Sequence, residues 1–152
     1  MSVIDRLNEE DGVEIEIETP RFSFIKRKSS GRIDFISPLP SLFNYGFIPG
    51  TLAPDGDPQD ALLLGVRLPR GARVRAQVQG KVRFVDAGER DDKLVCKAGP
   101  LTQGDRWTIE AFFAVYAAFK RTLNAARGRP GRTAFAGLEE REGASFSKGR
   151  SP

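Results

Sequence analysis

Asp55, Asp57 and Asp60 lie close together in the pattern Asp-Gly-Asp-Pro-Gln-Asp, on a segment stiffened by glycine and proline. Carboxylates at this spacing repel one another unless cations or hydrogen-bond donors hold them together. Hard divalent ions such as Mg²⁺ are bound by carboxylate oxygens and keep several water and phosphate ligands. The segment therefore predicts one edge of an oxygen-rich Mg²⁺ site. The alternative is a solvated turn, because aspartate, glycine and proline are common turn residues.

A second acidic cluster follows at residues 86–92, with Asp86, Asp91 and Asp92 among its members, and it ends in Lys93. Taken alone, the cluster is typical of a charged hairpin loop, because loops are generally polar. Two acidic clusters in one domain could instead hold two or more Mg²⁺ ions around a substrate whose phosphates are bound by lysines. Paired metal ions about 4 Å apart can activate water and stabilise both oxygens of a phosphoryl transfer.

Composition narrows the possible chemistry. The chain has 152 residues, enough for one domain with a core, and it contains no histidine. This excludes histidine-based zinc sites and catalytic triads with a histidine base, and leaves carboxylates, lysine, arginine, tyrosine and metal. The single cysteine, Cys96, excludes an internal disulfide and indicates a reducing cytoplasm. We find no membrane-spanning run and no signal-peptide pattern, so we expect a cytoplasmic protein without membrane contact.

The net charge of +4 is concentrated late in the chain, and residues 127–152 are predicted to form a basic, flexible tail. A further basic stripe runs along two expected strands and comprises Arg70, Arg73, Arg75, Lys81 and Arg83. A solvated sheet face is the simpler interpretation of this stripe. A surface for a nucleic acid is the alternative. Single-strand binding uses aromatic residues interleaved with the basic ones, and the chain has few of these.

Hydrophobic periodicity predicts several short strands followed by one helix. The strands are expected at residues 13–17, 22–25, 33–36, 61–68, 74–78, 82–85 and 94–96. Short strands separated by turns favour an antiparallel barrel or sandwich. The helix is expected over residues 105–126, with Asp105 as its N-cap and a stop at Gly128 and Pro130. We therefore divide the chain into a domain at residues 1–126 and the tail at 127–152.

Four segments of the chain resemble motifs of the family I soluble inorganic pyrophosphatases. Asn44-Tyr45-Gly46 with the Asp55–Asp60 segment is similar to the family signature, and residues 86–93 are similar to its second acidic loop. Residues 18–26, which begin Glu-Thr-Pro-Arg and end in lysine, resemble the opening motif, and residues 112–116 resemble the start of the C-terminal helix. The resemblance covers about residues 13–120.

The resemblance implies an OB-like, five-stranded antiparallel barrel with a C-terminal helix packed on it. It also implies Mg²⁺-dependent hydrolysis of pyrophosphate, or of a related phosphoanhydride, and a homo-oligomer. The implied metal-binding residues are Asp55, Asp60, Asp86, Asp91 and, through bound water, Glu18. Asp57 would orient or deprotonate the attacking water, and Tyr45 and Lys93 would join it as catalytic residues. The implied substrate-binding residues are Lys26, Lys93, Tyr45 and Tyr116.

Other family positions are substituted. Lys28, Ser41, Ala87 and Ala117 stand where the family has an acid, a tyrosine, an acid and a lysine, respectively. Either shifted residues supply the missing phosphate contacts (Arg27, Lys28, Arg32 and Lys120), or the chain is a catalytically weak or inactive relative that binds a metal-complexed anion or a protein partner. A basic, OB-like nucleic-acid binder is a third hypothesis.

Overall fold

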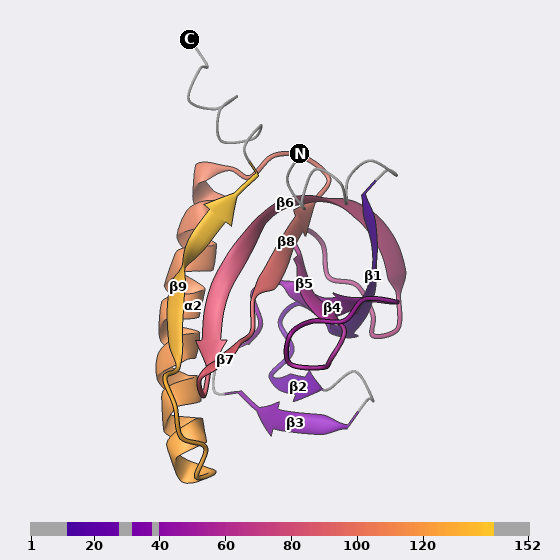
Figure 1. The fold of residues 1–152 in the computed structure, drawn as a ribbon. Helices are drawn as coiled ribbons and strands as arrows, with labels where there is room; N and C mark the ends of the chain where they lie inside the picture. Colours follow the sequence, from indigo (N-terminus) through magenta and orange to yellow (C-terminus); the bar gives the residue numbers. More distant parts are fainter. Residues whose placement is uncertain (1–11, 28–31, 38–39, 142–152) are drawn as a thin grey trace.

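The computed structural model describes residues 12–27, 32–37 and 40–141. Five strands form a closed ring in the order β1-β4-β5-β8-β6, because β6 also pairs with β1 (Figure 1). Their bounds are β1 Val13–Thr19, β4 Asn44–Ile48, β5 Gln59–Leu63, β6 Arg73–Asp86 and β8 Lys93–Lys97. Four of the five pairings are antiparallel, whereas β5 and β8 are parallel. The expected OB-like five-stranded barrel is confirmed, except that one pairing is parallel.

Strand β6 closes the ring because it is long enough to pair with both β1 and β8. Its first half pairs with β1 and its second half with β8, with a register shift between Val78 and Gly80. The sequence suggested two strands separated at Gly80, but the chain continues through this residue as one strand. A side chain at position 80 would clash, because a Cβ there would lie 2.5 Å from the Glu139 carbonyl oxygen. Glycine therefore permits the close approach of the neighbouring strand rather than a turn.

Helix α2 spans Gln103–Ala126, with Thr102 rather than Asp105 as its N-cap. Asp105 is the third helical residue, and its carboxylate accepts a hydrogen bond from the Thr102 backbone N–H in a reciprocal capping box. The buried residues of the helix recur every three or four positions and are Ile109, Phe113, Ala117, Lys120 and Asn124. This spacing places them on one face, directed toward the barrel. No helix in the described part of the chain is long and apolar enough to cross a membrane.

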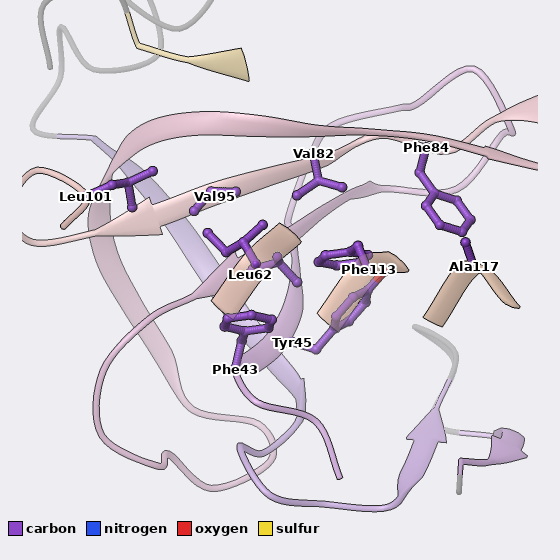
Figure 2. Close-up of a cluster of buried hydrophobic side chains, with 10 residues drawn as sticks. Phe43, Tyr45, Leu62, Val82, Phe84, Val95, Leu101, Phe113 and Ala117 are labelled. Atoms are coloured by element: carbon purple, nitrogen blue, oxygen red, sulfur yellow. The ribbon is translucent and has the colours of Figure 1, made fainter. Parts of the chain in front are cut away.

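The main core lies between α2 and the barrel. Phe113 packs against Phe43 and Phe84, with ring centroids 6.3 and 6.2 Å away (Figure 2). The Tyr116 ring lies 5.7 Å from it. A second buried cluster, which includes Ile15, Ile17, Val78 and Cys96, fills another part of the barrel. Burial raises the pKa of the Cys96 thiol to about 12, which agrees with a packed core residue rather than a nucleophile.

Four further strands complete the described part of the fold. Strands β2 (Ile25–Arg27) and β3 (Ile33–Ile36) form a separate antiparallel pair, and β7 (Glu89–Arg90) forms a hairpin with the end of β6. Strand β9 (Ala134–Glu140) pairs with β6 and lies beside α2 (Figure 1). The prediction of a tail from residue 127 therefore overlooked a strand that Phe135 and Leu138 attach to the core. Residues 142–152 lie outside the described part.

Candidate active site

A cavity of about 560 Å³ gathers nine of the ten residues that the sequence singled out. They are Glu18, Lys26, Tyr45, Asp55, Asp57, Asp60, Asp86, Asp91 and Tyr116. The tenth, Lys93, is only 1% exposed and is bonded to Asp60 and Asp91. The two acidic clusters and the opening motif therefore meet at one place, although up to 98 positions separate Glu18 from Tyr116 in the chain.

Glu18 enters the site through an irregularity in β1. Ile17 pairs with Gly46 and Thr19 pairs with Tyr45, so Glu18 is the extra residue of a β-bulge. Bulges commonly redirect a side chain next to a functional site. The Glu18 side chain is buried, and its Oε2 atom has no hydrogen-bond partner among residues 12–27, 32–37 and 40–141. Burial raises the pKa of Glu18 to about 7, which indicates a carboxylate without enough positive charge around it.

Asp60 and Lys93 are brought together by the parallel strand pair. They face each other in the β5–β8 register, and the Lys93 ammonium lies 3.0 Å from Asp60 Oδ2 and 3.0 Å from Asp91 Oδ2. The Tyr45 hydroxyl donates a hydrogen bond to the same Asp60 oxygen at 3.0 Å. These contacts join two predicted metal-binding carboxylates, the buried lysine and the predicted catalytic tyrosine in one network.

The charges of this network shift its pKa values in opposite directions. Burial would raise the pKa of Asp60, but the ammonium groups of Lys93 and Lys26 outweigh it and hold this pKa below its ordinary value. Burial raises the pKa of Asp91 to about 6. Burial would lower the pKa of Lys93, but the acidic groups around it keep this pKa above its ordinary range. Lys93 is therefore a cation whose charge is needed to keep Asp60 ionised.

Lys26 and the two tyrosines form a wall of the cavity. The Lys26 ammonium lies 3.3 Å from the centre of the Tyr45 ring, in a cation–π contact. Burial lowers the pKa of Lys26, although Asp60 and Glu18 oppose this shift. Tyr116 stacks on Phe112 at a centroid distance of 5.8 Å, which holds its ring toward the cavity from α2. The Lys26 amine and the two phenols line one cavity, and together they can donate hydrogen bonds to an anion.

Asp55 and Asp57 form the exposed edge of the cavity. The Asp57 backbone N–H donates to Asp55 Oδ1 at 3.0 Å, which closes a local turn at the positive-φ residue Gly56. Thr51 supports the loop by accepting from the Gln59 backbone N–H and donating to the Ile48 carbonyl. The solvated turn that the sequence left open is therefore present, and its carboxylates also line the cavity.

Asp86 faces the C-terminal end of α2. Its Oδ1 accepts a hydrogen bond from the Asn124 amide at 2.7 Å, and its Oδ2 lies 3.3 Å from the Lys120 ammonium and 3.6 Å from Arg129. Burial would raise the pKa of Asp86, but the Asn124 hydrogen bond and the two cations lower it. Asp86 is thus ionised and already neutralised by side chains of the protein.

Sequence reasoning missed three charged lining residues, namely Asp34, Arg127 and Arg129, and gave no role to Glu89 of the second acidic cluster. Lys120 was considered as a shifted phosphate contact, and it does line the cavity one helical turn beyond Ala117. Arg127 and Arg129 were assigned to the basic tail. The signal in the sequence was the pair Gly128 and Gly131, because glycines are common where the chain turns back tightly. Both have a positive φ in the structure.

The donor set fits a divalent metal in its chemistry. Carboxylate oxygens are the ligands that Mg²⁺ prefers, and Glu18 Oε2 is a buried acceptor that receives no hydrogen bond from the described residues. Within residues 12–27, 32–37 and 40–141, however, no three acidic or cysteine side chains already converge closely enough to hold an ion. Metal binding would therefore draw carboxylates away from Lys93 and Lys120.

The sequence profile described as inorganic pyrophosphatase matches residues 13–136, which is most of the chain. The chain belongs to the inorganic pyrophosphatase family. The match extends beyond the region of resemblance seen in the sequence motifs and includes the loop after α2 and the start of β9. The predicted family assignment is confirmed.

Individual relatives agree with this assignment. An inorganic pyrophosphatase of Gluconobacter oxydans is 37% identical over 92 residues, a match that covers 55% of this chain and 53% of the relative. One of Haemophilus influenzae is 54% identical over 54 residues, which is 35% of this chain and 31% of the relative. The chain therefore spans about half or less of the curated relatives it matches. A crystal structure from Neisseria gonorrhoeae has a TM-score of 0.69 at 28% identity and covers 93% of this chain and 89% of that chain.

The substituted family positions have structural uses in this pyrophosphatase-family chain. The Ser41 hydroxyl donates to the Phe43 carbonyl at 2.6 Å, and Ala117 is 2% exposed in the core. Ala87 has a positive φ of 51° next to Gly88 in the turn between β6 and β7. None of these three can supply a charged contact to a phosphate. Lys28 lies outside the described residues.

Proposed function

We propose that this protein hydrolyses pyrophosphate to two phosphates with the help of Mg²⁺. The observation that carries the proposal is the cavity itself, in which both acidic clusters meet Lys26, Tyr45 and Tyr116. Family membership supports the same reaction. A site of this composition can neutralise a polyanionic substrate with metal ions and lysine, and it can accept a proton through a carboxylate.

The metal-binding residues that we propose are Asp55, Asp60, Asp86 and Asp91, with Glu18 acting through bound water. Bound Mg²⁺ would supply charge neutralisation and a more acidic water molecule at neutral pH. The donor set supports Mg²⁺ over softer metals, because every proposed ligand is an oxygen. The unpartnered Glu18 oxygen and its raised pKa are the features that a cation would relieve.

Asp57 is the residue that we propose to orient and deprotonate the attacking water. It stands at the exposed edge of the cavity, no cation of the described residues forms an ion pair with its side chain, and Asp55 accepts a hydrogen bond from its backbone N–H. Lys26 would bind phosphate oxygens, and the Tyr45 and Tyr116 hydroxyls would donate hydrogen bonds to them. These residues bind and orient the substrate, whereas Asp57 moves the proton.

Lys93 has two proposed tasks. In the described geometry its ammonium bonds to Asp60, to Asp91 and to the Asp91 carbonyl, so it first neutralises these carboxylates. If the two carboxylates bound a metal ion, the Lys93 ammonium would be free to bind a phosphate oxygen instead. A single buried cation would thereby serve the empty and the loaded site.

The contacts of the basic stripe argue against the nucleic-acid hypothesis. Arg73 is paired with Glu14 and Glu16, and Arg83 is paired with Glu139. Two of the five cations of the stripe are thus paired with acids on neighbouring strands, and none of the five lines the cavity, which weakens the case for a phosphate backbone along this face. The weak-paralogue hypothesis loses force because Lys120 lines the cavity although Ala117 does not.

We also propose a cytoplasmic homo-oligomer. The outward face of α2 carries Trp107 at 73% exposure and Val115 at 51% exposure, together with small alanines. A second copy of the chain could bury this apolar stripe, and a sedimentation experiment tests the idea. The wild type should sediment as an oligomer that Trp107→Lys dissociates; a monomeric wild type would contradict it.

Phosphate release from pyrophosphate tests the proposed reaction. We expect the purified full chain to release two phosphates per pyrophosphate in Mg²⁺ and none in excess chelator, with activity restored by added Mg²⁺. Release that is unaffected by chelator would contradict the metal-dependent mechanism. No release by protein that is folded by circular dichroism would contradict the reaction itself.

A further inference from the structure

We propose that Lys120, Arg127 and Arg129 form a phosphate-binding subsite at the C-terminal end of α2. All three line the same cavity as Asp55 and Asp57. The inference rests on the proposed function, because it assigns one phosphoryl group of the substrate, and the inorganic phosphate product, to these cations. It deepens that function with residues that the motifs of the sequence did not include.

Each of the three cationic side chains forms an ion pair with a carboxylate, and this contact fixes the orientation of the side chain. Lys120 and Arg129 lie 3.3 and 3.6 Å from Asp86 Oδ2. Arg127 donates to the backbone carbonyl of Asp34 at 2.8 Å and lies 3.4 Å from its carboxylate. Arginine has five donors in a planar fork, so one edge can hold a protein oxygen while another binds a phosphate bidentately.

The loop that carries the arginines is fixed against the turn between β6 and β7. The Gly88 backbone N–H donates to the Arg132 carbonyl at 2.7 Å, and the Ala87 N–H donates to the Thr133 hydroxyl at 3.0 Å. At Gly131 the backbones are so close that a Cβ would lie 2.6 Å from the Ala87 carbonyl carbon. The subsite is thus held in place before any ligand arrives, which lowers the entropic cost of binding.

The distribution of charge around the cavity supports such a subsite. The acidic edge attracts metal ions but repels a phosphate that is not metal-bound, and the buried Ala117 cannot contact one. Lys26 lies on Tyr45, in another part of the lining. The positive charges of α2 and its following loop lie by Asp86 and Asp34, where they can neutralise the phosphate oxygens that metal ions leave uncovered.

Binding of inorganic phosphate to the full chain tests the subsite separately from turnover. Calorimetric titrations with phosphate, in Mg²⁺ and in chelator, would compare the wild type with Arg127→Gln and Arg129→Gln. Arg132→Gln is the matched control, because Arg132 is an exposed arginine in the same loop that does not line the cavity. We expect each of the first two variants to weaken phosphate binding about tenfold or more, and the control to change it less than twofold.

Two further variants guard against loss of structure. Arg127→Lys and Arg129→Lys keep the charge and should recover part of the affinity, and circular dichroism should be unchanged in all variants. Equal phosphate affinity in Arg127→Gln, Arg129→Gln and Arg132→Gln would overturn the subsite, as would a wild type that does not bind phosphate. If phosphate binding depends on the two arginines but pyrophosphate is not hydrolysed, the subsite stands and the proposed function fails.

Discussion

Glu18 is a buried carboxylate whose charge is not fully compensated by the residues that the structure describes. Burial raises its pKa from 4.5 to about 7. The folded pKa lies above the unfolded one, so ionisation of Glu18 costs stability as the pH rises from about 4.5 to 7, and the full cost is present above pH 7. This cost is the physical reason for expecting a bound cation beside it.

We therefore predict that Glu18→Gln stabilises the metal-free protein at pH 8 by about 1–2 kcal/mol, and has little effect at pH 4. Chemical denaturation in chelator measures the free energy of unfolding at both pH values. Glu110→Gln, on the exposed face of α2, is the control for loss of a carboxylate. A destabilised Glu18→Gln at pH 8 would refute the account of this residue.

The sequence pointed to the acidic residues that line the cavity but not to the two arginines that line it, for a physical reason. Asp55, Asp57 and Asp60 are neighbours in the chain, so their repulsion and their purpose are visible in one short segment. Arg127 and Arg129 reach the cavity only because the chain returns along β6 after α2. That return depends on contacts between distant strands, which composition does not reveal.

At the scale of elements, the start of α2 is stabilised by Asp105. Burial would raise the pKa of Asp105, but the hydrogen bonds from Lys97 and Thr102 outweigh it and lower the pKa. A lowered folded pKa means that the contribution is present above the unfolded value of about 4 and is lost as the pH falls through the folded pKa.

Asp105→Asn should therefore reduce the free energy of unfolding by about 0.5–1 kcal/mol at pH 7 and make its decline between pH 5 and 2 shallower. Denaturation across this pH range, beside Glu110→Gln, measures both effects. An unchanged slope would mean that the carboxylate has no ionic partner in the folded protein.

The loop between α2 and β9 depends on Gly131, which has a φ of +108° and no space for a side chain. We predict that Gly131→Ala destabilises the protein by about 1–3 kcal/mol and raises the KM for pyrophosphate by displacing Arg129. Steady-state kinetics and thermal unfolding measure these effects. Gly99→Ala is the control, since a Cβ at that position meets no atom within 4 Å. Identical KM values in the two variants would disconnect the loop from the site.

Helices and strands could be predicted from the sequence where a single hydrophobic period is clear. The alternation at 13–17 and the helical spacing before Ala126 correspond to β1 and α2. The N-cap was misplaced because Thr102 and Asp105 both occupy capping-box positions, and only geometry decides between them. Strand β9 was missed because Gly137 interrupts it and its residues are only partly buried.

At the scale of the whole molecule, Phe113 joins the helix, the barrel and β9. It is 1% exposed and contacts the rings of Phe43 and Phe84 (Figure 2). It also contacts the ring of Phe135 in β9. Phe113→Ala should lower the free energy of unfolding by about 3–5 kcal/mol, because it leaves a cavity where three layers meet. Phe22→Ala, at a side chain that is 53% exposed, should cost less than about 1 kcal/mol. Comparable losses in the two variants would contradict a common core.

The central claim is that this cavity, rather than another surface, carries out hydrolysis through Asp57. The most direct test is the kcat for pyrophosphate of Asp57→Asn in saturating Mg²⁺, beside Glu139→Gln, which removes a carboxylate paired with Arg83 outside the cavity. The account predicts that Asp57→Asn lowers kcat by a factor of about 100 or more while Glu139→Gln stays near the wild type. Equal kcat values in Asp57→Asn and the wild type would contradict the account.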